Sequence, residues 1–358
     1  MDGLVRCEID LKRAEQNFRF VRERVGGLLC CVVKADAYGH GAAVLAPLYE
    51  RWGADWLAVA TAREGITLRE AGVTLPCLVL GYTPPAEADL LTEHRLTQSV
   101  GSLSYAEALS AACGQTLSVH IAIDTGMGRF GFRCFESEAV FWSLVRALRL
   151  PRLHAEGIFT HFATGAGDAC KKQRARFEEV LADLTEMGLK PPLVHGANSA
   201  LALGEGGWDM ARVGILLYGY TPNGETREVL PVLSLTGRVV ARRTVGRGET
   251  VGYGGAYLAE RPRLIATLPV GYADGIPRGA AGATVQIRGI PCPIVGRVCM
   301  DQTTVDATEV PHLQEGDVFC LPDFGELAAV CGTIPYELLT HPRTRLVRVY
   351  THREDMGK

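Results

Sequence analysis

Between residues 28 and 219, short apolar runs alternate with longer segments of mixed polarity. The runs are "LLCCVV" (28–33), "WLAVA" (56–60), "PCLVL" (76–80), "LTQSV" (96–100), "LSVHIAI" (117–123), "AEGIFT" (155–160), "PLVHG" (192–196) and "RVGILLYG" (212–219). Segments such as 62–72 and 171–188 lie between them, and the second carries apolar residues at helical spacing and ends in glycine. Eight alternating strands and helices predict a parallel (β/α)₈ barrel.

After about residue 225 the pattern changes to strand-like runs with few helical segments. Examples are "VLSLTGRVVARRTV" (232–245) and "ATVQIRGIPCPIVGRV" (283–298), which are separated by glycine, proline and aspartate turns. We therefore predict a barrel over residues 1–225 and a second, mostly β domain over residues 226–358.

Composition narrows the class of protein. The formal net charge is −3 and 22% of the residues are charged, so no basic field favours nucleic acid. The N-terminus has no apolar signal region, and no apolar stretch approaches the roughly 18 residues that span a bilayer. Eleven scattered cysteines without a CxxC pair indicate core residues in a reducing compartment, not metal ligands. These features predict a cytoplasmic protein without a metal or membrane site.

Polar residues follow several of the predicted strands, at the end where barrel enzymes place their active sites. The residues at or after the strand ends are Lys34, Asp124, Arg129, His161, His195, Asn198 and Ser199, and the eighth predicted strand opens with Arg212 and Gly214. Each alone has an ordinary explanation, because a lysine at a strand end usually reaches solvent and a lone histidine is usually structural. Their convergence on one predicted rim indicates an active site.

Lys34 directly follows a buried run, where a lysine can form a Schiff base, bind phosphate or act as a general base. Tyr38 is predicted at the start of the next helix, where free amides can hold an anion. Ser199 and Gly214 fall in the turns where such barrels commonly bind phosphate. A Schiff-base lysine opposite a phosphate site points to pyridoxal phosphate.

Nine motifs in order then resemble the pyridoxal-phosphate-dependent alanine racemases along nearly the whole chain. They are "VVKADAYGHG", "DTGMGRFG", "THFA", "ANSA", "RVGILLYG", "VGYGGAY", "GYADG", "IVGRVCMDQ" and "PYE". The resemblance implies interconversion of L- and D-alanine by two bases, supplying D-alanine for peptidoglycan. It also implies a head-to-tail homodimer.

The resemblance also implies a role for each matching residue. Lys34 would hold the cofactor through a Schiff base and act as the base on one face of the substrate α-carbon. Tyr253, from the other subunit, would be the base on the opposite face, with His161 as its stabilising neighbour. The implied phosphate ligands are Tyr38, Ser199, Gly214, Ile215 and Tyr336. Arg212 would face the pyridine nitrogen, keeping it unprotonated.

Further matching positions concern the substrate. Arg129 and the backbone of Met300 would bind its carboxylate. The residues implied at the entrance are Tyr272, Arg278 and Arg297. Many relatives carry a carbamylated lysine seven residues before this arginine, where the present chain has Ala122, so another group must orient Arg129. We hypothesise a small anion such as chloride, or another side chain.

Several alternatives remain at this stage. Tyr272 is a rival to Tyr253 as the second base, because it also lies at a predicted strand end. The substrate is open between alanine and serine, since an apolar pocket discriminates weakly against an added hydroxyl. A decarboxylase of the same barrel class and a non-catalytic pyridoxal phosphate carrier are further possibilities.

Overall fold

The computed structural model describes residues 4–204, 208–222, 228–341 and 343–352. The chain forms two compact units. One comprises residues 16–217 and 221–229, and the other comprises the described residues before 16, residues 218–220 and those from 230 onward. The prediction of a boundary at residue 225 stays a prediction.

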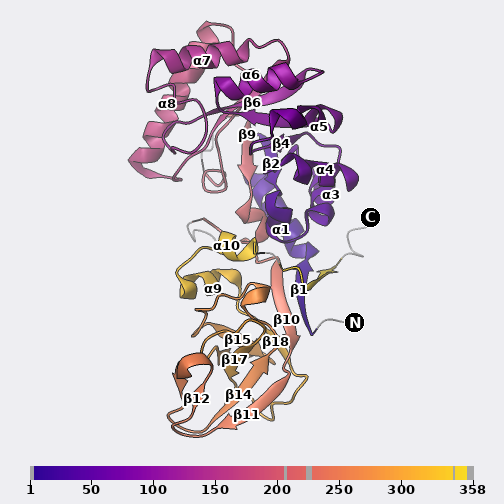
Figure 1. Ribbon diagram of the computed structural model, residues 1–358, viewed down its shortest axis with the longest axis vertical. Helices are drawn as coiled ribbons and strands as arrows, with labels where there is room; N and C mark the ends of the chain where they lie inside the picture. The colour runs from indigo at the N-terminus through magenta and orange to yellow at the C-terminus, as the bar shows by residue number, and fades with distance from the viewer. Residues whose placement is uncertain (1–3, 205–207, 223–227, 342, 353–358) are drawn as a thin grey trace. The chain divides into compact units, whose positions relative to one another are not determined.

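The first unit is a closed barrel of eight parallel strands, which confirms the predicted fold (Figure 1). Its strands are β2 (Leu28–Val32), β3 (Trp56–Val59), β4 (Cys77–Val79), β5 (Leu96–Val100), β6 (Leu117–Ile123), β7 (Leu153–Thr160), β8 (Leu193–His195) and β9 (Met210–Val213). Strands β2, β3 and β4 are almost wholly apolar because both of their faces are covered, as a parallel sheet requires.

The eighth strand differs from its prediction. It begins at Met210 and ends at Val213, and a 3₁₀ turn, η2 (Ile215–Tyr218), follows it. The run "ILLY" looked like a strand because a short buried apolar run has no periodicity that separates strand from helix. Arg212 therefore lies inside the strand instead of opening it.

Helices connect the barrel strands and pack outside them (Figure 1). They are α3 (Ala42–Trp52), α4 (Ala62–Glu70), α5 (Ala88–Glu93), α6 (Leu103–Ala112), α7 (Glu138–Leu148) and α8 (Gly167–Glu186), with a 3₁₀ turn, η1 (Pro85–Glu87), before α5. Several of these helices have side-chain caps at their N-termini. Ser102 and Ser137 cap α6 and α7, and Thr61 with Glu64 forms a capping box on α4. In the described part of the chain, no helix is long and apolar enough to cross a membrane.

The second unit is mostly strand, as predicted (Figure 1). Its main sheet has the order β16-β15-β18-β10-β1-β19, and a three-stranded sheet has the order β11-β14-β17. The strands are β1 (Val5–Asp10), β10 (Leu233–Arg238), β11 (Ala241–Val245), β12 (Thr250–Val251), β13 (Tyr257–Leu258), β14 (Arg263–Leu268), β15 (Thr284–Ile287), β16 (Ile290–Pro293), β17 (Thr303–Asp306), β18 (Val318–Cys320) and β19 (Val347–Thr351).

Two features of this unit were not predicted. Strand β1 comes from the start of the chain, yet it pairs antiparallel with β10 and parallel with β19. Helices α9 (Phe324–Cys331) and α10 (Pro335–Leu339) lie between β18 and β19, and α10 carries Tyr336. Helix α1 (Leu11–Arg24) follows β1 and leads into the barrel.

Candidate active site

Lys34 lies directly after strand β2, at the carboxyl end of the barrel. The strand ends at Val32, and the amide of Val33 still donates to the carbonyl of Ala58 in β3 at 2.8 Å. Lys34 is thus the first residue beyond the parallel ladder, where barrel enzymes commonly carry catalytic groups.

The residues after Lys34 form a left-handed turn, α2 (Lys34–Tyr38). Residues 35–38 have φ between 52° and 55°, which L-amino acids with side chains rarely adopt. The prediction that Tyr38 starts a helix is therefore wrong, since the next right-handed helix begins at Ala42.

Side chains from three positions hold this turn. The amide of Ala35 donates to Glu64 at 2.7 Å, and the amide of Ala42 donates to Asp36 at 2.7 Å. His40 donates from Nδ1 to the backbone carbonyls inside the turn, with distances of 2.9 and 3.0 Å. Left-handed backbone costs about 1–2 kcal/mol per residue, so these bonds are needed to offset it.

Tyr38, Ser199 and Gly214 come together at the same end of the barrel. The amide of Gly214 donates to Ser199 Oγ at 3.0 Å. A Cβ at position 214 would lie 2.6 Å from the hydroxyl of Tyr38, so only glycine leaves room for the phenol. Ile215 follows at the start of η2. Hydroxyls and a glycine backbone gathered in this way can surround a phosphate.

Arg212 is buried inside the barrel and is surrounded by acceptors. One of its terminal nitrogens is 2.5 Å from His195 Nδ1, and the other donates to the carbonyl of Thr160 at 2.9 Å. The second nitrogen also lies 3.4 Å from His161 Nδ1. Phe159 lies under the guanidinium, 5.0 Å away. Burial lowers the pKa of Arg212 to about 10, which leaves the group charged at neutral pH.

Burial, together with the neighbouring cations, lowers the pKa of two bases near Arg212. Burial lowers the pKa of Lys34, and Arg129 and Arg212 lower it further, while Glu64 acts in the opposite direction. Burial, followed by Arg212, Arg129 and Lys34, lowers the pKa of His161 to about 3. His161 is therefore neutral at physiological pH, and a larger fraction of Lys34 is a free amine than in water.

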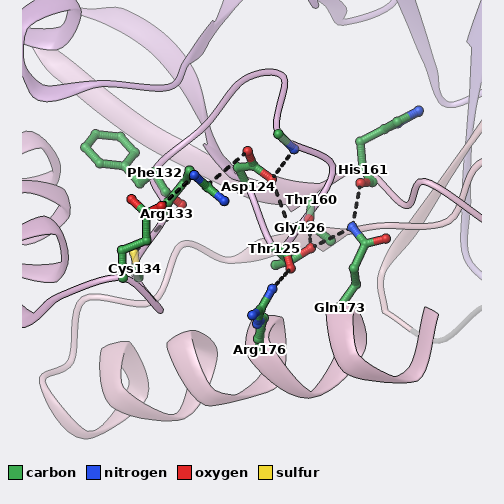
Figure 2. A network of polar contacts seen from close by, with 12 residues as sticks. Asp124, Thr125, Gly126, Phe132, Arg133, Cys134, Thr160, His161, Gln173 and Arg176 are labelled. Carbon is green, nitrogen blue, oxygen red and sulfur yellow. Dashed lines mark hydrogen bonds and ion pairs between the residues drawn. The ribbon is translucent and has the colours of Figure 1, made fainter. Parts of the chain in front are cut away.

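The loop that carries Arg129 is organised by Asp124. This buried carboxylate accepts from the amides of Gly126 and Gly128 at 2.9 and 3.0 Å, and Arg133 lies 3.7 Å away (Figure 2). The guanidinium of Arg129 itself is exposed and has no hydrogen bond or ion pair with the described residues. Asp124 thus fixes the backbone of the loop and leaves Arg129 available to a ligand.

Helix α8 ties the loops after β6 and β7 together (Figure 2). The buried amide of Gln173 donates to Thr125 Oγ1 and to the carbonyl of His161, both at 3.1 Å, and accepts from the amide of Ala163 at 2.9 Å. Arg176 donates to the carbonyl of Thr125 at 2.8 Å. The helix therefore helps to fix the backbone at His161.

Position 122, where many relatives carry the carbamylated lysine, is a buried alanine in β6. An alanine methyl cannot accept a hydrogen bond from Arg129. Since Arg129 has no partner among the described residues, no carboxylate or amide side chain from that part of the chain replaces the carbamate. The anion alternative stays a prediction.

Tyr253 lies in the second unit, in a tight turn, η3 (Tyr253–Gly255). Gly252 and Gly254 have φ of 78° and 69°, which permits the reversal. A Cβ at Gly254 would lie 3.4 Å from a terminal nitrogen of Arg297, so the turn packs against that side chain. The side chain of Tyr253 is 67% exposed in this chain.

Tyr272 and Met300 lie on adjoining loops of the same unit. The amide of Tyr272 donates to the carbonyl of Cys299 at 3.0 Å, and the amide of Ala273 donates to that of Met300 at 3.1 Å. The amide of Met300 itself donates to none of the described residues. Both side chains are exposed, as is Arg278.

A salt-bridge network clamps these two loops. Arg345 contacts Asp274, two residues after Tyr272, at 2.9 Å, and Asp301, next to Met300, at 2.6 Å. Sequence reasoning did not single out this arginine.

Tyr336 lies half-buried in α10, and burial raises its pKa to about 12.

The predicted residues of the barrel unit are therefore brought together at one end, and those of the second unit lie on neighbouring loops or in α10. Sequence reasoning missed the supporting side chains, above all Glu64 and Gln173. No local pattern distinguishes Gln173 from an ordinary helix residue.

Comparison with known proteins gives one consistent family. Residues 9–222 match the alanine racemase N-terminal domain and residues 232–350 match the alanine racemase C-terminal domain. An alanine racemase of Desulfovibrio desulfuricans is 42% identical, with 98% of each chain covered.

Solved structures agree. The alanine racemase of a D-cycloserine-producing Streptomyces lavendulae is similar with a TM-score of 0.92 and 31% identity, covering 99% of both chains. That of Bartonella henselae, solved with covalently bound pyridoxal phosphate, has a TM-score of 0.87 and 29% identity over 97% of this chain and 99% of that one. The fold, the motifs and the matched lengths agree, and the chain therefore belongs to the alanine racemase family.

Proposed function

We propose that this protein interconverts L- and D-alanine with pyridoxal phosphate as cofactor. The observation that carries the proposal is that Lys34, directly after β2, shares one end of the barrel with the buried, donor-only guanidinium of Arg212, whose charge helps to lower the pKa of Lys34. Membership of the alanine racemase family supplies the reaction.

The residues present fit the cofactor. Lys34 can bond covalently to its aldehyde as a free amine, which a lowered pKa favours. Tyr38, Ser199, Gly214 and Ile215 would hold the phosphate, and the family resemblance adds Tyr336 to this set. Arg212 can only donate hydrogen bonds, so at the pyridine nitrogen it would keep that atom an unprotonated acceptor. When bound, the cofactor withdraws electrons from the substrate α-carbon and so acidifies its proton.

Racemisation needs proton transfer on both faces of one carbon. Lys34 would serve one face and Tyr253 the other. A guanidinium has only donor atoms, so His161 Nδ1, which lies 3.4 Å from Arg212, must accept the hydrogen bond. The neutral ring of His161 therefore carries its proton on Nε2. That N–H is then available to stabilise the phenolate of Tyr253. Arg129 and the free amide of Met300 would bind the substrate carboxylate.

We further propose a homodimer in which Tyr253 acts in the partner's site, with Tyr272, Arg278 and Arg297 at the entrance. The exposure of Tyr253, Tyr272 and Met300 in a single chain supports this, because large apolar side chains at 67%, 38% and 53% exposure favour a partner surface. A cytoplasmic location and a role in supplying D-alanine for peptidoglycan fit the family and the eleven free cysteines.

Chiral product analysis tests the reaction. Holoenzyme given L-alanine should produce D-alanine, and L-serine in a parallel incubation should react more slowly. Carbon dioxide as the product would indicate a decarboxylase, and no product would indicate a carrier. Borohydride reduction followed by peptide mapping should place the cofactor on Lys34, and a label on another lysine would refute that assignment.

A further inference from the structure

A line of buried polar side chains crosses the barrel interior beneath Arg212, and the mechanism above does not use it. His195 Nε2 lies 2.7 Å from Nδ1 of His120, which belongs to strand β6. Both imidazoles are fully buried. Beyond them, His120 Nε2 is 3.8 Å from the carboxylate of Glu156 in strand β7 and has no hydrogen-bond partner.

The chemistry of Arg212 fixes every proton along this line. A guanidinium only donates, so His195 Nδ1, 2.5 Å away, must accept. Burial lowers the pKa of His120 to about 3 and that of His195 well below its usual value, so both rings are neutral. His195 therefore carries its proton on Nε2 and donates it to His120 Nδ1. His120 in turn carries its proton on Nε2, which faces Glu156.

Packing holds both rings in these orientations. The ring of Phe159 stacks on that of His195, with centroids 5.0 Å apart and planes 7° apart. A Cβ at Gly157 would lie 2.6 Å from the ring of His120, so the backbone there leaves space only for glycine. Thr97 and Ser118 donate to Glu156 at 2.7 and 3.2 Å, which holds the carboxylate in place beside His120 Nε2.

We propose that His120 and Glu156 are positioning residues that hold His195 in the tautomer that accepts from Arg212. The bonds from Arg212 to His195 and from His195 to His120 are aligned and polarise each other in a low-dielectric interior, and the negative charge of Glu156 acts on the N–H of His120 across 3.8 Å. The Glu156 carboxylate thereby favours the charged form of Arg212. It also favours the orientation in which the other terminal nitrogen of Arg212 donates to the carbonyl of Thr160. The consequence for catalysis rests on the proposed function, because it assumes that Arg212 faces the cofactor.

The direct test uses the unaltered holoenzyme with ¹⁵N-labelled histidine. Long-range ¹H–¹⁵N correlation spectra distinguish the two neutral tautomers and the cation. We expect His195 and His120 both to be neutral and protonated on Nε2 at pH 7. A proton on Nδ1 of His195, or a charged ring, would overturn the proposal. This outcome does not depend on racemase activity, so a protein that made no D-alanine would still give a decisive spectrum.

Two substitutions at His120 separate positioning from packing. His120→Asn keeps an acceptor near the place of Nδ1, whereas His120→Leu removes it at similar size. We expect His120→Leu to move part of the His195 population to the Nδ1–H tautomer and to lower kcat about 10- to 100-fold, as loss of such supporting groups typically does, with little change in KM. His120→Asn should restore the tautomer and most of the rate. Equal spectra and equal rates for the two variants would contradict the proposal.

Glu156→Gln tests the end of the line, and Glu179→Gln is its control, because Glu179 is an exposed carboxylate on α8. We expect only Glu156→Gln to shift the His120 Nε2–H resonance and to lower kcat by about tenfold, at the weaker end of such supporting effects. Identical spectra for the wild type and Glu156→Gln would exclude a role for the carboxylate.

Discussion

One added methyl group tests whether Tyr38 and Gly214 hold the cofactor phosphate. In Gly214→Ala, the new Cβ would lie 2.6 Å from the hydroxyl of Tyr38 and 3.1 Å from its Cζ. Ordinary contacts begin at about 3.4 Å, so the hydroxyl must retreat by about 0.8 Å. Tyr38 is only 6% exposed, so it has little room to move. The backbone conformation at Gly214 is accessible to alanine, which leaves the contact as the main effect.

Such overpacking costs about 1–3 kcal/mol. If the strain falls on the phosphate site, the affinity for pyridoxal phosphate should fall by about 5- to 150-fold, since each 1.4 kcal/mol is tenfold. The assay is titration of the apoenzyme with the cofactor, followed by the change in absorbance. Gly26→Ala is the control, because nothing lies within 4 Å of its new Cβ, and its affinity should match the wild type.

The cause can be confirmed by removing the hydroxyl. In a Tyr38→Phe background, the nearest atom to the new Cβ is Cζ at 3.1 Å, which a small shift relieves. Adding Gly214→Ala there should weaken binding much less than it does in the wild type, because contacting residues are not additive. Unchanged affinity in Gly214→Ala, or the same loss in both backgrounds, would refute the assignment of the phosphate site.

Three further predictions concern charge and assembly. Burial lowers the pKa of His120 and His161 to about 3 and that of His195 well below its usual value, so unfolding takes up protons as the pH falls through about 6.5. These three histidines should together lower the free energy of unfolding by about 3.7 kcal/mol between pH 7 and 5.5, and equal urea midpoints would contradict this. If an anion lies beside Arg129, chloride should lower KM for alanine at constant ionic strength; a dependence on dissolved carbon dioxide, or on neither, argues against it. Mixing Lys34→Ala with Tyr253→Phe should restore one intact site per heterodimer, and no recovery after exchange verified by mass would indicate a site within one chain.

Local patterns predicted the barrel because its strands are short, apolar and regularly spaced. Strands β5 and β6 have the predicted bounds. The sequence did not predict the left-handed turn after Lys34. Its amide at Ala35 is held by Glu64, 29 positions away, and the side chains of Asp36 and His40 bond to nearby backbone groups. Propensity describes common conformations, and a strained turn held by tertiary contacts is not one of them.

Pairing between distant segments was equally hidden. Strand β1 joins a sheet with β10, which lies more than 200 residues later, and "VRCEID" alone does not name its partner. Likewise, residues that bear chemistry could be predicted from motifs, whereas the contact between His120 and His195 depends on how the barrel closes. Sequence patterns can therefore identify the side chains that carry chemistry, but they seldom identify the residues that orient those side chains.

The central claim is that Lys34 and Tyr253 exchange protons on opposite faces of one carbon. It is tested most directly by single-turnover exchange of the α-hydrogen in deuterium oxide, with Tyr253→Phe and each enantiomer of alanine. Removing a positioned acid or base typically costs about 10²- to 10⁴-fold. Exchange from L-alanine should slow by that factor, and exchange from D-alanine should slow far less, because Lys34 still serves its face. Small and equal effects on both enantiomers would contradict the account and transfer the role to Tyr272.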